Sequence, residues 1–127
     1  MITDENANSA GEPAVDFEQL RAASGDDAAL LQDLVNLYFG QAGDIMTSLR
    51  GALDKQSAGD VDYLAHKLVG ASLACGMTVM VAPLRELEKR GRAGNLTGAE
   101  EFMAQTVVNL ETVRTAVEDY IRNNNPA

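Results

Sequence analysis

His66 is the only histidine in this chain of 127 residues, and its neighbours place it on the outer face of a predicted helix. Apolar residues of the segment recur at about 100° per residue, the spacing of a helix that faces a core. They are Val61, Leu64, Leu68, Ala71 and Cys75. His66 projects about 160° from the centre of that stripe, and Gly70, one turn later, removes side-chain bulk beside the ring. An accessible imidazole on a rigid helix is suited to accept a chemical group from another macromolecule.

The outer face around His66 is more apolar than a solvated helix face usually is. Tyr63, Val69 and Leu73 lie near the histidine on the helical wheel, and apolar side chains gathered on an exposed face indicate a docking surface. Gly70 costs about 1 kcal/mol of helix stability relative to alanine, so its place beside the ring needs a compensating reason. Periodicity alone leaves an inert surface histidine as the alternative.

Other kinds of catalytic site lack the residues that they need. A single histidine excludes sites with several imidazole ligands and the paired Glu-x-x-His motifs of di-iron bundles. The sequence has no glycine-rich loop of the kind that holds ATP or NAD and no serine in a nucleophile-elbow context. We therefore predict no metal site and no cofactor, and His66 carries the chemistry if the chain performs any.

Composition excludes several classes of partner. The formal net charge of −9 disfavours binding to nucleic acid or to an anionic membrane, because both need Lys and Arg. Cys75 is the only cysteine, so it cannot form an internal disulfide, and we expect it to be a buried apolar residue. No apolar run reaches the length of a membrane span, and the polar N-terminus does not resemble a secretory signal. We expect a soluble cytoplasmic protein without membrane insertion.

Composition and periodicity predict a helical chain. Abundant Ala, Leu and Val, with no Trp and only three prolines, favour helices over strands. The predicted helices are a short one at 15–20, long ones at about 27–55 and 60–76, one that begins or kinks near Pro83, and one at about 99–121. Four substantial helices joined by short turns predict an all-α fold, an antiparallel up-and-down four-helix bundle with a short additional N-terminal helix.

The remaining segments follow from the same pattern. Residues 90–95, which read Arg-Gly-Arg-Ala-Gly-Asn, form the clearest predicted loop. We expect a flexible tail at 1–14, the bundle at 15–123 and a C-terminal tail at 124–127. The second helix contains three glycines, whose small size is expected to permit close approach of a neighbouring helix. They are Gly40, Gly43 and Gly51.

The segment around His66 resembles the signature of histidine-containing phosphotransfer (HPt) domains. In that family a glycine follows the histidine after four residues and a serine after six, as Gly70 and Ser72 do here. Two later stretches, 84–88 and 92–94, are similar to the next helix and loop of the family. The resemblance implies a four-helix bundle that carries phosphoryl groups between response-regulator receiver domains, not an enzyme, and without ATP binding of its own.

The resemblance also implies a role for each residue of the segment. His66 would be the phosphoacceptor, with a neutral Nε2 that attacks the phosphoaspartate of a receiver; histidine suits this step because imidazole titrates near neutral pH. Magnesium would come from the receiver, and the partners would be receiver domains, with the receiver of a hybrid sensor histidine kinase as one candidate. Gly70 would give the receiver room to approach. Docking contacts would come from Tyr63, Val69 and Leu73. Ser72 lies toward the inner face of the helical wheel, so we assign it mainly to packing.

One position departs from the family pattern. The family often has a lysine three residues after the histidine, and this chain has Val69 there. Lys67 is the nearest base in sequence, but it lies about 100° round the helix from His66, so it either reaches part of the way to the phosphoryl group or is simply solvated. We hypothesise that Val69 makes the docking surface more apolar and selects particular receivers.

Two other functions stay open at this point. The absent lysine favours a helical interaction module that docks on a receiver or kinase and carries no phosphoryl group. An acidic helical domain with a purely structural role in a larger assembly would bind no receiver at all.

Overall fold

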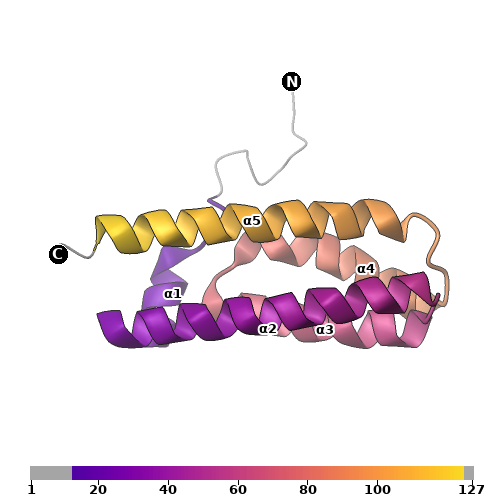
Figure 1. Cartoon of the computed structure of the whole chain (residues 1–127), viewed down its shortest axis with the longest axis horizontal. Helices are drawn as coiled ribbons and strands as arrows, with labels where there is room; N and C mark the ends of the chain where they lie inside the picture. The colour runs from indigo at the N-terminus through magenta and orange to yellow at the C-terminus, as the bar shows by residue number, and fades with distance from the viewer. Residues whose placement is uncertain (1–12, 125–127) are drawn as a thin grey trace, which may run out of the picture.

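The computed structural model describes residues 13–124, and within that range it contains five α-helices, one short 3₁₀ helix and no β-strand (Figure 1). The elements are α1 Phe17–Ser24, α2 Ala28–Asp54, α3 Ala58–Cys75, η2 Thr78–Met80, α4 Val81–Ala93 and α5 Ala99–Asn123. The prediction of an all-α chain with a short N-terminal helix is confirmed. Residues 1–12 and 125–127, which make up most of the two predicted tails, lie outside the described residues. No helix in the described part is long and apolar enough to cross a membrane.

The long helices pack against one another in sequence order. α2 packs on α3, α3 on α4 and α4 on α5, and α5 also contacts α2. The most extensive of these contacts joins α3 to α4, whereas α2 and α5 are the two longest helices (Figure 1). The short α1 contacts α2 and α3 at one end of the molecule. The α3–α4 pair is therefore the most firmly joined part of the framework.

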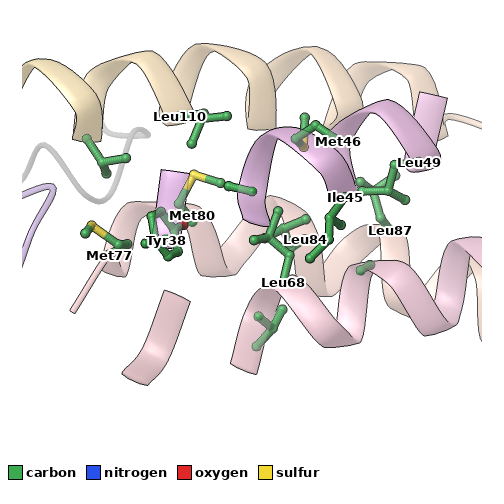
Figure 2. Close-up of a cluster of buried hydrophobic side chains, with 14 of the residues drawn as sticks. Tyr38, Ile45, Met46, Leu49, Leu68, Met77, Met80, Leu84, Leu87 and Leu110 are labelled. Carbon is green, nitrogen blue, oxygen red and sulfur yellow. The ribbon is translucent and has the colours of Figure 1, made fainter. Parts of the chain in front are cut away.

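The core consists mainly of Leu, Met and Val side chains between these helices (Figure 2). Leu68 of α3, Leu84 and Leu87 of α4 and Leu49 of α2 are fully buried. Full burial of a side chain of this size contributes about 1.5–3 kcal/mol, so the packing of α3 between α2 and α4 fixes the orientation of α3. That orientation decides which of its residues face solvent.

Gly91 lets α3 and α4 approach closely. A Cβ at this position would lie 2.5 Å from the backbone nitrogen of Asp62 and 2.6 Å from the carbonyl oxygen of Ala58, so no larger residue fits. The predicted loop at 90–95 is wrong over residues 90–93, because α4 remains helical as far as the turn at Gly94, where φ is 71°. The first glycine of that stretch serves helix packing and the second serves chain reversal.

The three glycines of α2 do not pack against a neighbouring helix. Apart from the backbone of the same helix turns, no described heavy atom lies within 4 Å of the position that a Cβ would take at Gly40, Gly43 or Gly51. The prediction that these glycines permit close helix approach is wrong, because they lie on the outer side of α2, and α2 continues through all three.

The chain ahead of α1 is bound to the end of α3. Asp16 donates its backbone N–H to the carbonyl of Gly76 at 2.7 Å, and Val79 donates to the carbonyl of Ala14 at 3.1 Å. Thr78 Oγ1 also donates to the Ala14 carbonyl, at 3.0 Å, and Val15 is fully buried. Ala14, which was assigned to the tail, is therefore held against the body of the molecule.

Candidate functional site

The side chain of His66 is exposed near the middle of α3. The side chain is 69% exposed, which confirms the prediction of an accessible ring. Its Nδ1 lies 2.7 Å from Oε2 of Glu88 on α4. The ring therefore lies beside the α3–α4 interface and not directly opposite the core.

The buried face of α3 is rotated toward α4 relative to the predicted stripe. Its buried residues are Val61, Ala65, Leu68, Val69, Ser72 and Cys75. Leu64 and Ala71, which were predicted to belong to the stripe, are only half-buried. The cause is the close packing of α4, which covers one flank of α3 and brings the position of His66 within reach of a side chain on α4.

Val69 does not belong to the exposed surface. It is only 2% exposed, so the prediction that it supplies a docking contact is wrong, and the hypothesis that it selects receivers falls with it. The residue lies on the flank of α3 that α4 covers. Its role is core packing.

Glu88 is a buried carboxylate that binds three neighbouring side chains. Its side chain is 6% exposed. Its Oε2 faces Nδ1 of His66 and accepts from Nη2 of Arg92 at 2.8 Å, while Oε1 accepts from Nη1 of Arg85 at 3.3 Å. Burial by itself raises the pKa of Glu88, but the hydrogen bonds from His66 and Arg85 and the charge of Arg92 hold that pKa below its usual value. The carboxylate is therefore ionised at neutral pH.

An ionised Glu88 decides which nitrogen of His66 carries the proton. A carboxylate can only accept, so Nδ1 must donate, and the lone pair of the neutral ring is on Nε2. Because Glu88 occupies the Nδ1 side of the ring, Nε2 is the nitrogen that a partner reaches. The pair resembles in principle the carboxylate–histidine pairs that orient an imidazole for nucleophilic or base chemistry.

The exposed surface beside the ring combines apolar side chains with open space. Tyr63 is 63% exposed and Leu73 is 48% exposed, as predicted. Apart from the backbone of the same helix turns, no described heavy atom comes within 4 Å of the Cβ position of Gly70, so the glycine leaves room on the outside of the helix. Nζ of Lys67 lies 6.0 Å from the ring centroid of Tyr63. These residues and His66 form the outer face of α3, which we call the docking face.

Ser72 has a packing role, as predicted. It is fully buried, and its hydroxyl lies 2.7 Å from the hydroxyl of Tyr38 on α2, so each satisfies the other in the core. Burial raises the pKa of Tyr38 to about 12, so the phenol stays neutral. Cys75 is buried as predicted.

Sequence reasoning missed Glu88 and Arg92. Glu88 lies in register with Leu84, Leu87 and Gly91, the positions that α4 turns inward, and a carboxylate on a buried face signals that a partner must exist. That signal was present in the sequence, although it does not name His66. Arg92 could not be placed because it fell in the predicted loop.

Comparisons with known proteins are consistent with this geometry. A family model described as Hpt domain matches residues 33–122, a range that contains the docking face and Glu88. No relative is found among curated protein sequences. Among solved structures, the chain is similar to the crystal structure of histidine-containing phosphotransfer protein B (HptB) from Pseudomonas aeruginosa PAO1, with a TM-score of 0.81 and 21% sequence identity over 89% of this chain and 98% of that chain. At this identity the likeness shows a shared fold.

Proposed function

Because the chain belongs to the Hpt domain family of phosphocarrier modules, we propose that it relays a phosphoryl group between response-regulator receiver domains as phosphohistidine at His66. The observation that carries this proposal is the pairing of an exposed imidazole with a buried carboxylate. Nδ1 of His66 lies 2.7 Å from Glu88, and the side chain of His66 is 69% exposed. One nitrogen orients the ring, and the other is open to a partner.

The transfer step needs no proton to leave the ring. The lone pair of Nε2 attacks the phosphorus of a receiver phosphoaspartate, the N–P bond forms, and the O–P bond breaks to release the aspartate carboxylate. The ring keeps its proton on Nδ1 and becomes positively charged, and the carboxylate of Glu88 balances that charge. Transfer to a second receiver reverses these events.

Glu88 acts in this scheme as a positioning residue. It is nearly buried and bound to Arg85 and Arg92, so it cannot turn away without leaving a buried charge unpaired. It therefore holds the ring in one orientation before the receiver arrives, which reduces the entropy lost in reaching the transition state.

The docking face fits the approach of a receiver. Gly70 leaves space next to the ring, and Tyr63 and Leu73 offer apolar area on either side of it. Lys67 extends over Tyr63 and adds a positive charge at the edge. We assign the magnesium of the reaction to the receiver and no cofactor to this chain. The receiver of a hybrid sensor kinase is one candidate donor.

The same proposal covers the bundle itself. We assign α2, α3, α4 and α5 to the antiparallel up-and-down four-helix bundle of the family, within a domain at residues 15–123. The contacts of α2 with α3, α3 with α4, α4 with α5 and α5 with α2 support this assignment.

The direct test is transfer of label from a receiver. The full chain is mixed with a receiver that carries ³²P-labelled phosphoaspartate, and the label that moves to the chain is expected to be acid-labile and alkali-stable, as a phosphoramidate is. His66→Gln is expected to abolish the label and leave the fold intact, because the side chain is exposed. Label that survives this change would exclude His66 as the acceptor. Receiver binding by the wild-type chain without any label would identify the interaction module instead.

A further inference from the structure

Arg92 shares one carboxylate oxygen with the reactive histidine. Oε2 of Glu88 lies 2.7 Å from Nδ1 of His66 and 2.8 Å from Nη2 of Arg92. Because both nitrogens contact the same oxygen, Nη2 of Arg92 lies close to Nδ1 of His66. Arg85 also binds Glu88, but through Oε1, at 3.3 Å. Of these two arginines, Arg92 binds the oxygen that faces the ring.

The side chain of Arg92 lies at the surface and is free to change partner. Its side chain is 67% exposed, and its second contact, to Asp62 of α3, is 3.4 Å long. Because the guanidinium itself is mostly exposed, it can exchange one partner for another without leaving a buried site. If Arg92 leaves, Glu88 keeps Arg85 and the ring as partners. The buried carboxylate would therefore remain paired.

Phosphorylation of His66 changes what each group needs. Before transfer, the ring that attacks the phosphoryl group donates to Glu88 through Nδ1 and brings no charge of its own, so arginine balances the carboxylate. In the phosphorylated protein the ring itself is positive at Nδ1, and the phosphoryl oxygens add negative charge on the exposed side. After phosphorylation, therefore, the phosphoryl group and not Glu88 carries the negative charge that lacks a neighbouring cation. The planar guanidinium suits phosphoryl oxygens, because it donates two parallel hydrogen bonds.

The position of Lys67 and the identity of residue 69 make Arg92 the better placed cation. Nζ of Lys67 lies over the ring of Tyr63, and Val69, at the position where the family often has a lysine, is apolar and buried.

We infer that Arg92 changes partner when His66 is phosphorylated. It leaves the carboxylates of Glu88 and Asp62 and binds the phosphoryl oxygens instead. This inference rests on the proposed function. Arg92 is a charge-balancing residue that stabilises the phosphorylated form relative to the free form. The equilibrium of transfer from a phosphorylated receiver therefore shifts toward this chain because of Arg92.

The test measures the equilibrium constant for transfer from one phosphorylated receiver onto the full chain and its variants. Arg92→Gln is expected to lower this constant about 3- to 10-fold, the range of a charge-assisted hydrogen bond at a partly exposed site. Arg92→Lys is expected to recover most of the loss, because it keeps the charge. Asp62→Asn, which releases Arg92 from its second partner, is expected to raise the constant by up to about 2-fold.

Two matched variants control for a general change of charge. Arg85→Gln removes the other arginine on Glu88 and is expected to change the constant less than Arg92→Gln does. Arg122→Gln removes an exposed arginine that pairs with Asp119 on α5 and is expected to leave the constant unchanged. A spectroscopic readout separates exchange of partners from a structural role, because the ¹⁵N–¹H signal of the Arg92 guanidinium should shift when His66 is phosphorylated.

Each possible failure has a separate meaning. If His66 takes label but Arg92→Gln leaves the equilibrium constant unchanged, or if the guanidinium signal does not move, the inference is overturned and the proposed function stands. An equal loss in Arg122→Gln would overturn it as well, since the effect would then be one of net charge. If the wild-type chain takes no label at all, the proposed function itself fails.

Discussion

The α3–α4 interface and the α2–α5 side of the molecule are built from similar helices but differ in how closely the helices meet. Gly91 brings α4 against the backbone of α3, and the carboxylate of Glu88 is enclosed there among the ring and two arginines. Between α2 and α5 the surface is hollowed into a groove of about 640 Å³, lined among others by Phe39, Gly40 and Arg114.

A hollow in the surface does not by itself mark the reactive site that we propose. The charged residues that line the groove are half-buried or exposed, and Arg114 is stacked at 4.5 Å on the ring centroid of Phe39. At the α3–α4 interface a buried ionised group is matched to an exposed nucleophile. An exposed histidine is also what a macromolecular partner needs, because a receiver must bring its own active site to the ring. Close packing therefore serves function here by fixing Glu88 behind an accessible ring.

The largest expected effect is on stability, and it comes from substituting the glycine that packs between helices. A Cβ at Gly91 would meet only backbone atoms, at 2.5, 2.6 and 2.9 Å, so Gly91→Ala must separate α3 from α4. We expect a loss of about 2–3 kcal/mol in the free energy of unfolding, together with slower labelling of His66, measured by urea unfolding and by receiver transfer. Gly40→Ala is the matched control. With open space around it, this change should raise the free energy of unfolding by about 0.5–1 kcal/mol.

If the two glycine variants destabilised the protein equally, the contrast between the two regions would be false. Slower labelling in Gly91→Ala would be attributed to the displaced carboxylate only if the variant is still folded at the temperature of the assay, which far-ultraviolet circular dichroism checks.

The carboxylate of Glu88 is expected to give the next effect. Glu88→Gln keeps the shape and a hydrogen-bond acceptor for Nδ1, but removes the charge that balances the ring as the N–P bond forms. We expect the rate of label transfer to His66 to fall about 10- to 100-fold, measured by single-turnover kinetics. Glu86→Gln, on the same helix, is the control, because Glu86 pairs with Arg90 away from the ring. Equal rates in Glu88→Gln and the wild type would mean that Glu88 is only structural.

Acid unfolding offers a second measurement on the same residue. Because the pKa of Glu88 in the folded chain lies below its ordinary value, the ionised carboxylate stabilises the fold above that ordinary value, and this contribution is lost as pH falls through the folded pKa. Glu88→Gln should therefore weaken the dependence of stability on pH below the ordinary range of glutamate. A pH profile identical to that of the wild type would contradict this assignment.

Much of this site was predictable from local pattern, and the parts that were not depend on the neighbouring helix. The helical spacing around His66 predicted an exposed ring with Gly70, Tyr63 and Leu73 on the same side, because those positions depend on one helix alone. Val69 was misplaced because its burial depends on α4, which covers one flank of α3. A helical wheel drawn for one helix cannot show which of its flanks a neighbouring helix covers.

The contact between His66 and Glu88 is a property of the fold and not of either segment. The two residues are 22 positions apart, and their meeting requires that α4 return along α3 at the distance that Gly91 permits. Glu88 lies on the inner register of α4, a signal that sequence reasoning missed, and the sequence alone gives no means of pairing it with His66. The roles of the glycines were the hardest to predict from sequence, because Gly91 lies in a close helix contact whereas Gly40 lies on the open surface.

The smallest effect is expected at the apolar part of the docking face, and it sharpens the comparison because α5 also carries exposed apolar side chains. Tyr63 and Leu73 flank the ring on α3, whereas Val108 on α5 is 57% exposed, more than Leu73 at 48%. If exposure alone made a docking surface, truncating any of them would weaken receiver binding alike. We expect Tyr63→Ala and Leu73→Ala each to weaken binding about 10-fold, as loss of an anchoring side chain does, and Val108→Ala to change it less than 2-fold. Titration of an unphosphorylated receiver by calorimetry measures all three, and an equal loss in Val108→Ala would move the docking surface away from the histidine.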